Sequence, residues 1–530
     1  MSAGKIQILV ILGAGLLAGY LSIHSGSSTA DFSYTVNAPL SNSITITYYT
    51  GASGKVSIPA TLKGLPVTCL GRDAFYGRTN LVSVTIPASV SNIGFEAFAD
   101  CDSLRCFIVD AANQSFSSVD GALFDKTQTR LINYPRGRKG SYSIPGHVTS
   151  IERGAFNSGT NLTGVTIPSS VTNIELGAFT LCANLKAINV DAANNCFCSM
   201  DGVLLNKAKT SLIQYPEGKF GACAIPDGVI SIEPEAFVYC PAAECTNLTS
   251  VTIPASVTNI EWAFWTCPNL TNITVDASNP IFSSRDGVLF DKNQTKLIRY
   301  PKGKAGSYAI PATVTNFNGA FSECANLTGI TIPRSISSIG ESAFYFCTSL
   351  TNVIIPASVR SIGSGAFHVC PNLPGITVDE NSAYFSSKDG FLFNKFPTKT
   401  TRIRQPGGKY KKHTVPIRGP SIAWCSPCTN VTHVTLPGYV TQIDDYAFND
   451  CYSLTRIIIP ASVIRIEGGA FRYCTNLTEV CFEGNAPDAD PNIFYGTDRV
   501  IVYYLLGTTG WAEKFGDRPT ALWHRQLQNQ

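Results

Sequence analysis

The sequence predicts a repeat solenoid, built mainly of parallel β-strands with short helical turns and inserted β-hairpins. One phrase carries this prediction: Leu81 to Ser103 (LVSVTIPASVSNIGFEAFADCDS) recurs with few changes along the chain. The recurrences begin at Leu162, Leu327, Leu350, Val431 and Leu454. A short unit restated many times indicates a chain in which each unit buries its apolar face only against its neighbours. A second observation is that four longer units, each with an Asp-Gly pair, interrupt the short ones.

Each short unit is expected to form one coil. Val84 and Ile86 alternate as in a strand with one inward face, and Pro87 ends that strand because proline lacks an N–H. Ile93 belongs to a second inward-facing segment, and Phe98 is placed on a short helical turn that closes the coil. The phenylalanines expected to align in the core are Phe98, Phe179, Phe344, Phe367, Phe448 and Phe471.

The longer units share the pattern FSSxDGxLFxKxxTxLIxYPxGKxGSYxIP. They run over residues 104–161, 185–247, 270–326 and 373–430. Asp-Gly between apolar, β-prone runs predicts a hairpin, because a type I′ turn needs positive φ at both central residues. The expected tips are Asp120-Gly121, Asp201-Gly202, Asp286-Gly287 and Asp389-Gly390. Calcium binding by these aspartates is the alternative, but the Asp-x-Asp-x-Asp ligand spacing is missing.

The short units resemble the BspA-type leucine-rich repeats, a family of bacterial and protist surface proteins. The resemblance covers residues 56–477 and rests on many copies of LxxVxIPxxVxxIxxxAFxxCxxL. It implies a right-handed leucine-rich-repeat coil. It also implies export and, from studied members, adhesion to host or neighbouring-cell proteins, without naming a ligand.

The segments outside the repeats have separate expected roles. In residues 1–30, Lys5 precedes an apolar run, and Ser28-Thr29-Ala30 fits the small residues that a signal peptidase reads. The run is close to the shortest that spans a bilayer, so an uncleaved N-terminal anchor is the alternative. Residues 31–55 and 478–530 are expected to cap the two ends. For the aromatic residues of the last segment, carbohydrate stacking is the alternative to capping: Phe494, Tyr503, Tyr504, Trp511, Phe515 and Trp523.

Ten of the 18 cysteines occupy one repeat position, three residues before the next unit opens. They are Cys101, Cys182, Cys245, Cys267, Cys324, Cys347, Cys370, Cys428, Cys451 and Cys474. We expect a buried ladder of thiols, because cysteine packs well as a small hydrophobe. Disulfides are the alternative, since stacked strands lie within the span a disulfide tolerates. Cys425-Ser426-Pro427-Cys428 has redox and zinc spacing but lacks the further ligands or the βαβ setting such sites need.

Composition disfavours several function classes. A net charge of +3 on 530 residues argues against gross attraction to nucleic acid. The six histidines are scattered, and none lies in a metalloprotease or nucleophile motif. We therefore expect no enzyme and predict no catalytic residue, cofactor or metal site.

Two function classes remain from the sequence. The first is a secreted or cell-surface binding protein whose repeats contact an extracellular protein or glycan, with the membrane involved only through a retained N-terminal segment. The second is a structural envelope protein that associates with itself; the oligomeric state stays open. The longer units together carry a net charge of +8, although the second of them is acidic. Their basic return segments are the candidate ligand contacts, with simple solvation as the alternative: Arg136, Arg138, Lys139, Lys302, Lys304, Lys409, Lys411 and Lys412.

Overall fold

The chain folds into stacked β-coils. The structure is a computed structural model that describes residues 31–38, 42–51, 54–234, 236–237, 247–261, 263–388, 391–395, 398–404, 410–416, 421–425 and 432–523. These residues lie in strands and turns, and none of them is helical. Residues 1–219 with 233–243 form an N-terminal unit, and residues 220–232 with 244–530 form a C-terminal unit.

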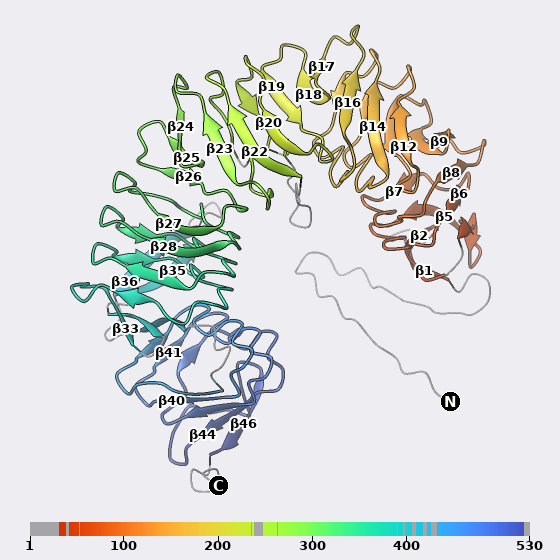
Figure 1. Cartoon of the computed structure of the whole chain (residues 1–530). Coiled ribbons are helices and arrows are strands. Elements are labelled where there is room, and N and C mark those ends of the chain that lie inside the picture. Colours follow the sequence, from red (N-terminus) through yellow and green to blue (C-terminus); the bar gives the residue numbers. More distant parts are fainter. Residues whose placement is uncertain are drawn as a thin grey trace. The chain divides into compact units, whose positions relative to one another are not determined.

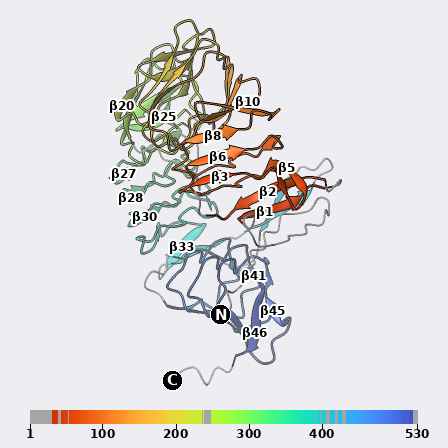
Figure 2. The same ribbon diagram turned by 90° about the vertical axis from the view of Figure 1, so that its right-hand side faces the viewer.

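The N-terminal unit contains a main ladder of parallel strands, which lie side by side in Figures 1 and 2. Its strands are β3 (Lys55–Ser57), β6 (Ser83–Ile86), β8 (Cys106–Val109), β12 (Gly140–Ser143), β14 (Leu162–Ile167) and β16 (Ala187–Val190). They pair as β3-β6-β8 and β12-β14-β16. Val84 and Ile86 are fully buried, whereas Ser83 and Thr85 between and beside them are partly exposed. The predicted alternation is confirmed.

A second ladder of shorter strands runs along another side of the coils. In the N-terminal unit its strands are β5 (Leu65–Leu70), β7 (Asn92–Ile93), β11 (Arg130–Asn133), β13 (Ser150–Ile151), β15 (Asn173–Ile174) and β19 (Ser211–Gln214). β7 pairs with β5, while β11, β13 and β15 form a separate parallel group. At the start of the chain, β1 (Phe32–Val36) pairs antiparallel with β2 (Ile44–Tyr49), β2 continues onto β5, and β4 (Thr61–Leu62) flanks β5.

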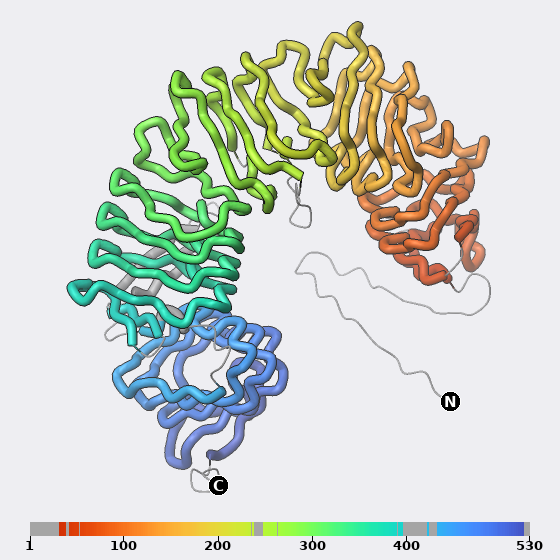
Figure 3. The backbone as a smooth tube through the Cα atoms, in the orientation of Figure 1, coloured from red at the N-terminus to blue at the C-terminus, as the bar shows by residue number. Residues whose placement is uncertain are grey.

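The C-terminal unit repeats this arrangement, and successive coils follow one another in Figure 3. Its main ladder contains β20 (Gly221–Ala224), β22 (Leu248–Ile253), β23 (Asn272–Val275), β27 (Gly306–Ala309), β28 (Leu327–Thr331), β30 (Asn352–Ile355), β32 (Thr377–Val378), β38 (His433–Thr435), β40 (Arg456–Ile459), β42 (Glu479–Phe482), β44 (Ile501–Tyr504) and β46 (Arg518–Leu522). Its second ladder contains β21 (Ser231–Ile232), β26 (Leu297–Arg299), β29 (Ser338–Ile339), β31 (Ser361–Ile362), β37 (Ser421–Cys425), β39 (Gln442–Ile443), β41 (Arg465–Ile466) and β43 (Asp488–Ala489).

The longer units contain the predicted hairpins. They are β9 (Phe116–Val119) with β10 (Ala122–Asp125), β17 (Phe197–Met200) with β18 (Val203–Asn206), β24 (Phe282–Arg285) with β25 (Val288–Asp291), and β33 (Phe385–Lys388) with β34 (Phe391–Asn394). Asp120 and Gly121 have φ of 47° and 74°, as a type I′ turn requires. The tips at Asp201 and Asp286 share this geometry, and the tip at Asp389 lies outside the described residues.

The fourth longer unit differs from the other three. In the first, β10 pairs directly with β11. In the fourth, β34 pairs with β37, and an extra antiparallel hairpin of β35 (Thr398–Arg404) and β36 (Tyr410–Pro416) is inserted between them in the sequence. Residues 405–409 of its return segment lie outside the described residues, and β36 begins at Tyr410.

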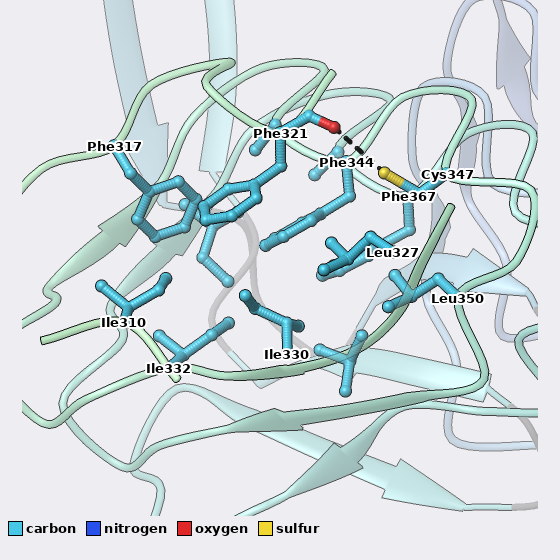
Figure 4. Close-up of a cluster of buried hydrophobic side chains, with 14 of the residues drawn as sticks. Ile310, Phe317, Phe321, Leu327, Ile330, Ile332, Phe344, Cys347, Leu350 and Phe367 are labelled. Atoms are coloured by element: carbon cyan, nitrogen blue, oxygen red, sulfur yellow. Dashed lines mark hydrogen bonds between the residues drawn. The ribbon is translucent and has the colours of Figure 1, made fainter. Parts of the chain in front are cut away.

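Stacked aromatic rings fill the core. The six phenylalanines predicted to align are all buried, and Figure 4 shows Phe321, Phe344 and Phe367 as successive rings of this column. The ring centroid of Phe344 lies 5.4 Å from those of both Phe321 and Phe367. In the longer units a tyrosine takes this place: Tyr134 lies 5.3 Å from Phe156, and Tyr300 lies 5.2 Å from Phe321. The aromatic column is confirmed.

The corner at Phe98 is not a helical turn, which corrects the sequence expectation. Glu96 and Asp100 have φ of 58° and 57°. Two left-handed residues four positions apart interrupt any right-handed helix between them. Instead, Ala99 N–H donates to Glu96 C=O at 2.9 Å, and Phe75 N–H donates to Ala97 C=O of the next coil at 2.7 Å. The corner is thus hydrogen-bonded both within itself and to the preceding coil.

The repeat-position cysteines are buried at every described position and form no disulfide there. Six of them donate to a backbone carbonyl of the preceding coil. Cys101 Sγ lies 3.1 Å from Phe75 O, and Cys347 Sγ lies 3.1 Å from Phe321 O, the bond drawn in Figure 4. Cysteine is therefore a small apolar residue that also supplies a proton to a buried carbonyl. Cys245 and the Cys425–Cys428 pair fall where the structure describes no side chains.

We predict that Cys324, Cys347 and Cys370 resist alkylation in the folded protein. Burial raises the pKa of the Cys324 and Cys370 thiols to about 12 and that of Cys347 further, so almost no thiolate forms at neutral pH. Iodoacetamide labelling followed by mass spectrometry is expected to modify these three positions only after denaturation. Rapid labelling in the native state, or disulfides between successive coils in a non-reducing digest, would contradict the thiol ladder.

Buried asparagines close the coil that precedes three of the hairpins, a feature absent from our sequence expectations. Asn279 Nδ2 donates to Pro254 O at 2.8 Å and to Val257 O at 2.9 Å. Its Oδ1 accepts from Ile281 N–H at 2.9 Å and Phe282 N–H at 2.7 Å. Asn113 and Asn194 make the same four contacts, whereas Ser382 stands at this position in the fourth longer unit. The signal is an asparagine three residues after an aspartate.

The ladders continue beyond Leu477. β42 pairs with β44, and β44 pairs with β46, which closes a short hairpin with β45 (Lys514–Phe515). Thr497 takes the cysteine position and donates to Phe471 O at 2.6 Å. The repeat pattern is harder to recognise there because a threonine hydroxyl replaces the cysteine thiol as the donor to the buried carbonyl. Trp511 stacks on Tyr504 at 5.2 Å and contacts Phe482, so the terminal rings pack on one another and on the last coils.

Candidate binding grooves

Two of the basic residues predicted to contact a ligand are internal. Arg136 and Lys302 are only 8% and 7% exposed. Arg136 Nη1 lies 2.9 Å from Asp100 Oδ1, and its Nε donates to Ser158 O at 3.0 Å. Lys302 forms an ion pair with Glu323. These cations hold neighbouring coils together, which corrects the expectation that they face a ligand.

The second longer unit places an acid at the same position. Glu217 follows Tyr215-Pro216 as Arg136 follows Tyr134-Pro135, and it is 4% exposed. Its Oε1 accepts from Leu181 N–H at 2.7 Å. Burial raises the pKa of Glu217 to about 7, against the opposing effect of backbone N–H donors. This position therefore holds a cation in one longer unit and an acid in another, and both contact the preceding coil. The stacked units do not form a basic column here.

We expect Glu217 to make stability depend on pH. Its folded pKa of about 7 lies above the ordinary value of 4.5, so the folded state binds the proton more tightly. The resulting stabilisation is complete below pH 4.5 and is lost as pH rises through 7. Between these pH values, the free energy of unfolding in urea should fall by about 1–3 kcal/mol less in Glu217→Gln than in the wild-type protein. Identical pH profiles for the two proteins would contradict the shift.

Other basic residues fasten the hairpin tips. Arg138 donates to the Asp120 carbonyl, and Lys219 Nζ lies 2.6 Å from Asp201 O and 3.0 Å from Asp201 Oδ2. A cation in the return segment thus holds the acidic tip of its own hairpin. The remaining candidates are distributed as follows: Lys139 is exposed, Lys304 is partly exposed, Lys411 and Lys412 lie on β36, and Lys409 lies outside the described residues.

An open groove of about 630 Å³ lies in the N-terminal unit where the second ladder is interrupted. One wall is the segment 91–99, which includes β7, and the other is formed by β11 and residues 152–157. Phe116 and Leu123 of the β9–β10 hairpin also line it. The groove exists because the first longer unit separates β7 from the β11–β13–β15 group.

An exposed phenylalanine stands in this first groove. Phe95 is 47% exposed, although it sits two residues before a buried Ala-Phe pair. The guanidinium carbons of Arg72 and Arg153 lie 5.8 and 5.9 Å from its ring centroid. Such cation–π contacts hold the ring while leaving part of it in water.

The opposite wall carries a bidentate ion pair. Arg130 Nε and Nη2 donate to the two carboxylate oxygens of Glu152 at 2.8 and 2.9 Å. The bonded Arg130 lowers the pKa of Glu152. Glu175 Oε2 accepts from Arg153 N–H at 2.9 Å. The groove therefore presents fixed polar groups around an apolar ring and floor.

A smaller groove of about 340 Å³ lies at the second interruption, between β15 and β19. Its lining includes Leu176, which is 46% exposed, and the carboxylates Glu175 and Glu233. No basic side chain lines it. At the third interruption, in the C-terminal unit, Arg299 stands where Gln214 lines the second groove, and its guanidinium stacks 3.6 Å above the Trp265 ring.

The groove residues were not among the sequence candidates. Phe95 and Leu176 offered the available signal, because other repeats carry Glu341, Ser364 or Gly468 at that position. The grooves themselves arise from ladder interruptions between residues far apart in the sequence. No spacing within one repeat reports them.

Aromatic side chains also gather on the corners of the last coils. Tyr473 and Tyr495 are 37% and 56% exposed, and Arg472 lies 4.8 and 5.0 Å from their ring centroids. A Cβ at Gly496 would fall 2.3 Å from a Tyr473 ring carbon. This glycine thus leaves room for the tyrosine to lie across the next coil.

The described residues hold no cluster of three or more His, Cys, Asp or Glu side chains that could bind a metal ion. His368 lies 3.3 Å from Asp450 and stacks on Tyr345 at 5.4 Å. Burial lowers the pKa of His368, so the ring is favoured as a neutral packing element. Within the part of the chain described here, no helix has the length and apolar character needed to cross a membrane.

Comparison with known proteins gives one family and several similar structures. The model described as "BspA type Leucine rich repeat region" matches in six copies, over residues 48–139, 68–200, 138–225, 214–303, 300–404 and 425–505. No curated protein matches the chain. A leucine-rich cell surface protein from Faecalibacterium prausnitzii is 26% identical, with 88% of this chain and 95% of that one covered and a TM-score of 0.34. A leucine-rich repeat protein from Eubacterium ventriosum is 18% identical (90% and 95% covered, TM-score 0.35), and the pneumococcal vaccine antigen PcpA is 17% identical (92% and 94%, TM-score 0.31).

Proposed function

The chain belongs to the BspA-type leucine-rich repeat family, and from this membership we propose that it is an exported or cell-surface binding protein that adheres to an extracellular protein or glycan. The observation that carries the proposal is the first groove. It combines about 630 Å³ of open volume with an exposed phenylalanine and fixed charged groups. Concave sites with an apolar surface and a few placed polar groups are typical of ligand binding.

The test is a binding measurement with immobilised matrix proteins and a glycan array, using the protein from residue 31 onward. We expect saturable binding to at least one probe and roughly a tenfold loss in Phe95→Ala, because exposed aromatic anchors dominate such contacts. Phe346→Ala is the matched control, since Phe346 is 44% exposed and lies in the C-terminal unit. Self-assembly without any heterologous ligand would instead support a structural envelope role.

A second surface in the proposal is the basic segment of the fourth longer unit. Lys409, Lys411 and Lys412 carry three like charges close together in the sequence. An acidic glycan would bind them with an affinity that falls as salt rises. Binding of a sulfated glycan at low and moderate salt should weaken when all three are changed to serine. Unchanged affinity in the folded variant would remove this electrostatic contact.

A further inference from the structure

The second ladder follows a regular hydrogen-bond rule. Within the N-terminal unit, each coil that pairs with the next offers it two carbonyls separated by one residue. Thr149 O accepts from Thr172 N–H at 2.8 Å, and Ile151 O accepts from Glu175 N–H at 2.9 Å. In a parallel pair the N–H of that same isoleucine points to the same neighbour. Each rung therefore presents two acceptors and one donor to the following coil.

This rule leaves two open edges in the N-terminal unit. Among the described strands β7 pairs only with β5, and β15 pairs only with β13. The carbonyl positions of that rule are Ser91, just before β7, and Ile93, and both line the first groove. At β15 the positions are Thr172, just before the strand, and Ile174, which lines the second groove. Each groove is thus bordered by an unpaired strand edge.

The main ladder is treated differently at the same interruptions. There the hairpin tip covers the open edge: Phe107 N–H donates to Gly121 O at 2.8 Å, and Ile188 N–H donates to Gly202 O at 2.9 Å. A Cβ at Gly202 would fall 2.8 Å from the Ala187 Cβ, so the tip fits closely. The chain therefore closes one edge with its own backbone and leaves the other beside a groove.

We propose that these two grooves are strand-addition sites, in which an extended segment of a partner polypeptide with basic side chains pairs with β7 or β15. The proposal rests on the adhesive function above and names the chemistry of its ligand. Edge strands bind peptides through main-chain hydrogen bonds, while alternate side chains enter flanking pockets. A glycan has no row of alternating N–H and C=O groups to match this edge.

The charges favour a basic segment. The second groove contains Glu175 and Glu233 without a basic partner in its lining. The first groove is lined by four carboxylates and three arginines. Arg130 is paired with Glu152 and Arg136 with Asp100, and Glu175 borders both grooves. A lysine or arginine of the added strand would reach these carboxylates. The exposed Phe95 and Leu176 offer apolar contact to the residues between.

The experiment selects a displayed library of random linear peptides on the protein from residue 31 onward. Enriched peptides are resynthesised with single N-methylated residues, which removes one N–H and keeps the side chain. We expect enrichment of lysine and arginine and a loss of ~5–10-fold for each methylated donor that faces the edge. Hydrogen exchange should show new protection at the Ile93 or Ile174 amide in the complex.

The matched variants separate charge from fold. Glu175→Gln keeps the acceptor for Arg153 N–H and should weaken basic peptides several-fold, whereas Glu380→Gln, an exposed position in the C-terminal unit, should not. Failure to enrich any peptide, or binding that ignores N-methylation and leaves both amides unprotected, would overturn strand addition. If the matrix and glycan panels still give saturable binding, the adhesive function stands and only this site assignment fails.

Discussion

Replacement of Phe344 by alanine is expected to lower the free energy of unfolding of its region by roughly 3–5 kcal/mol, the cost of removing a large buried aromatic side chain. Phe344 is fully buried and stacked between Phe321 and Phe367. The loss has two parts, the transfer of the ring and the cavity left in a column whose neighbours cannot close together. Because each coil is supported only by its neighbours, the damage should remain local.

Phe346→Ala provides the control for this variant. It changes the same residue type two positions later, but the side chain is 44% exposed. Hydrogen exchange over residues 327–373 should accelerate in Phe344→Ala and stay close to wild type in Phe346→Ala, and chemical unfolding should show the same order. Equal effects of the two substitutions would mean that the aromatic column does not hold the coils together.

Asn279→Asp is expected to be equally damaging although it barely changes volume. The amide nitrogen donates to Pro254 O and Val257 O, so a carboxylate would set an oxygen against two carbonyls in a fully buried site. Leaving a buried charge without a partner costs about 3–5 kcal/mol. The measurement is urea unfolding at neutral pH, with Asn80→Asp, an exposed asparagine, as the control. A loss of less than about 1 kcal/mol in the free energy of unfolding would show that the hydrogen bonds of Asn279 contribute little to stability.

The same asparagine hydrogen bonds predict that stability can be increased in the fourth longer unit. Ser382 accepts the Phe385 N–H at 3.2 Å but has no amide to donate. Pro356 and Val359 occupy the places of Pro254 and Val257 there. Ser382→Asn should therefore raise the free energy of unfolding by about 1 kcal/mol, because the asparagine amide supplies the missing donors. A destabilised variant would show that this coil is too tight for the longer side chain.

Features of the fold that depend only on residues within one repeat were predicted correctly from the sequence. The strand alternation, the phenylalanine column, the thiol ladder and the described Asp-Gly tips all follow from residues within a single unit. The helical turn expected at Phe98 was wrong because Glu96 and Asp100 adopt positive φ, and the carbonyls of Ala97 and Ala99 accept from the preceding coil. Asn279 also escaped notice, since its four partners come from two segments that the fold brings together.

The functional surface was harder to predict for the same reason. Net charge in the longer units pointed to Arg136 and Lys302, yet whether a cation faces water depends on the acid opposite it, here Asp100 and Glu323. The grooves depend on which strands fail to pair, which no local pattern records. Phe95 differs from the residues at the same position of other repeats, which the sequence shows. Its place in a groove follows only from the interruption of the second ladder beside it.

The thiol ladder has a consequence for how the chain reaches its destination. In the folded state the thiols of residues such as Cys347 are shielded and engaged with backbone carbonyls, so an oxidising compartment leaves them unchanged. Before folding, the same thiols are accessible and reactive. For an exported chain, as proposed above, coil formation must therefore precede oxidation of these thiols. A chain that stacks its coils promptly keeps these thiols reduced, whereas a slow one would form bridges that the described coils do not contain.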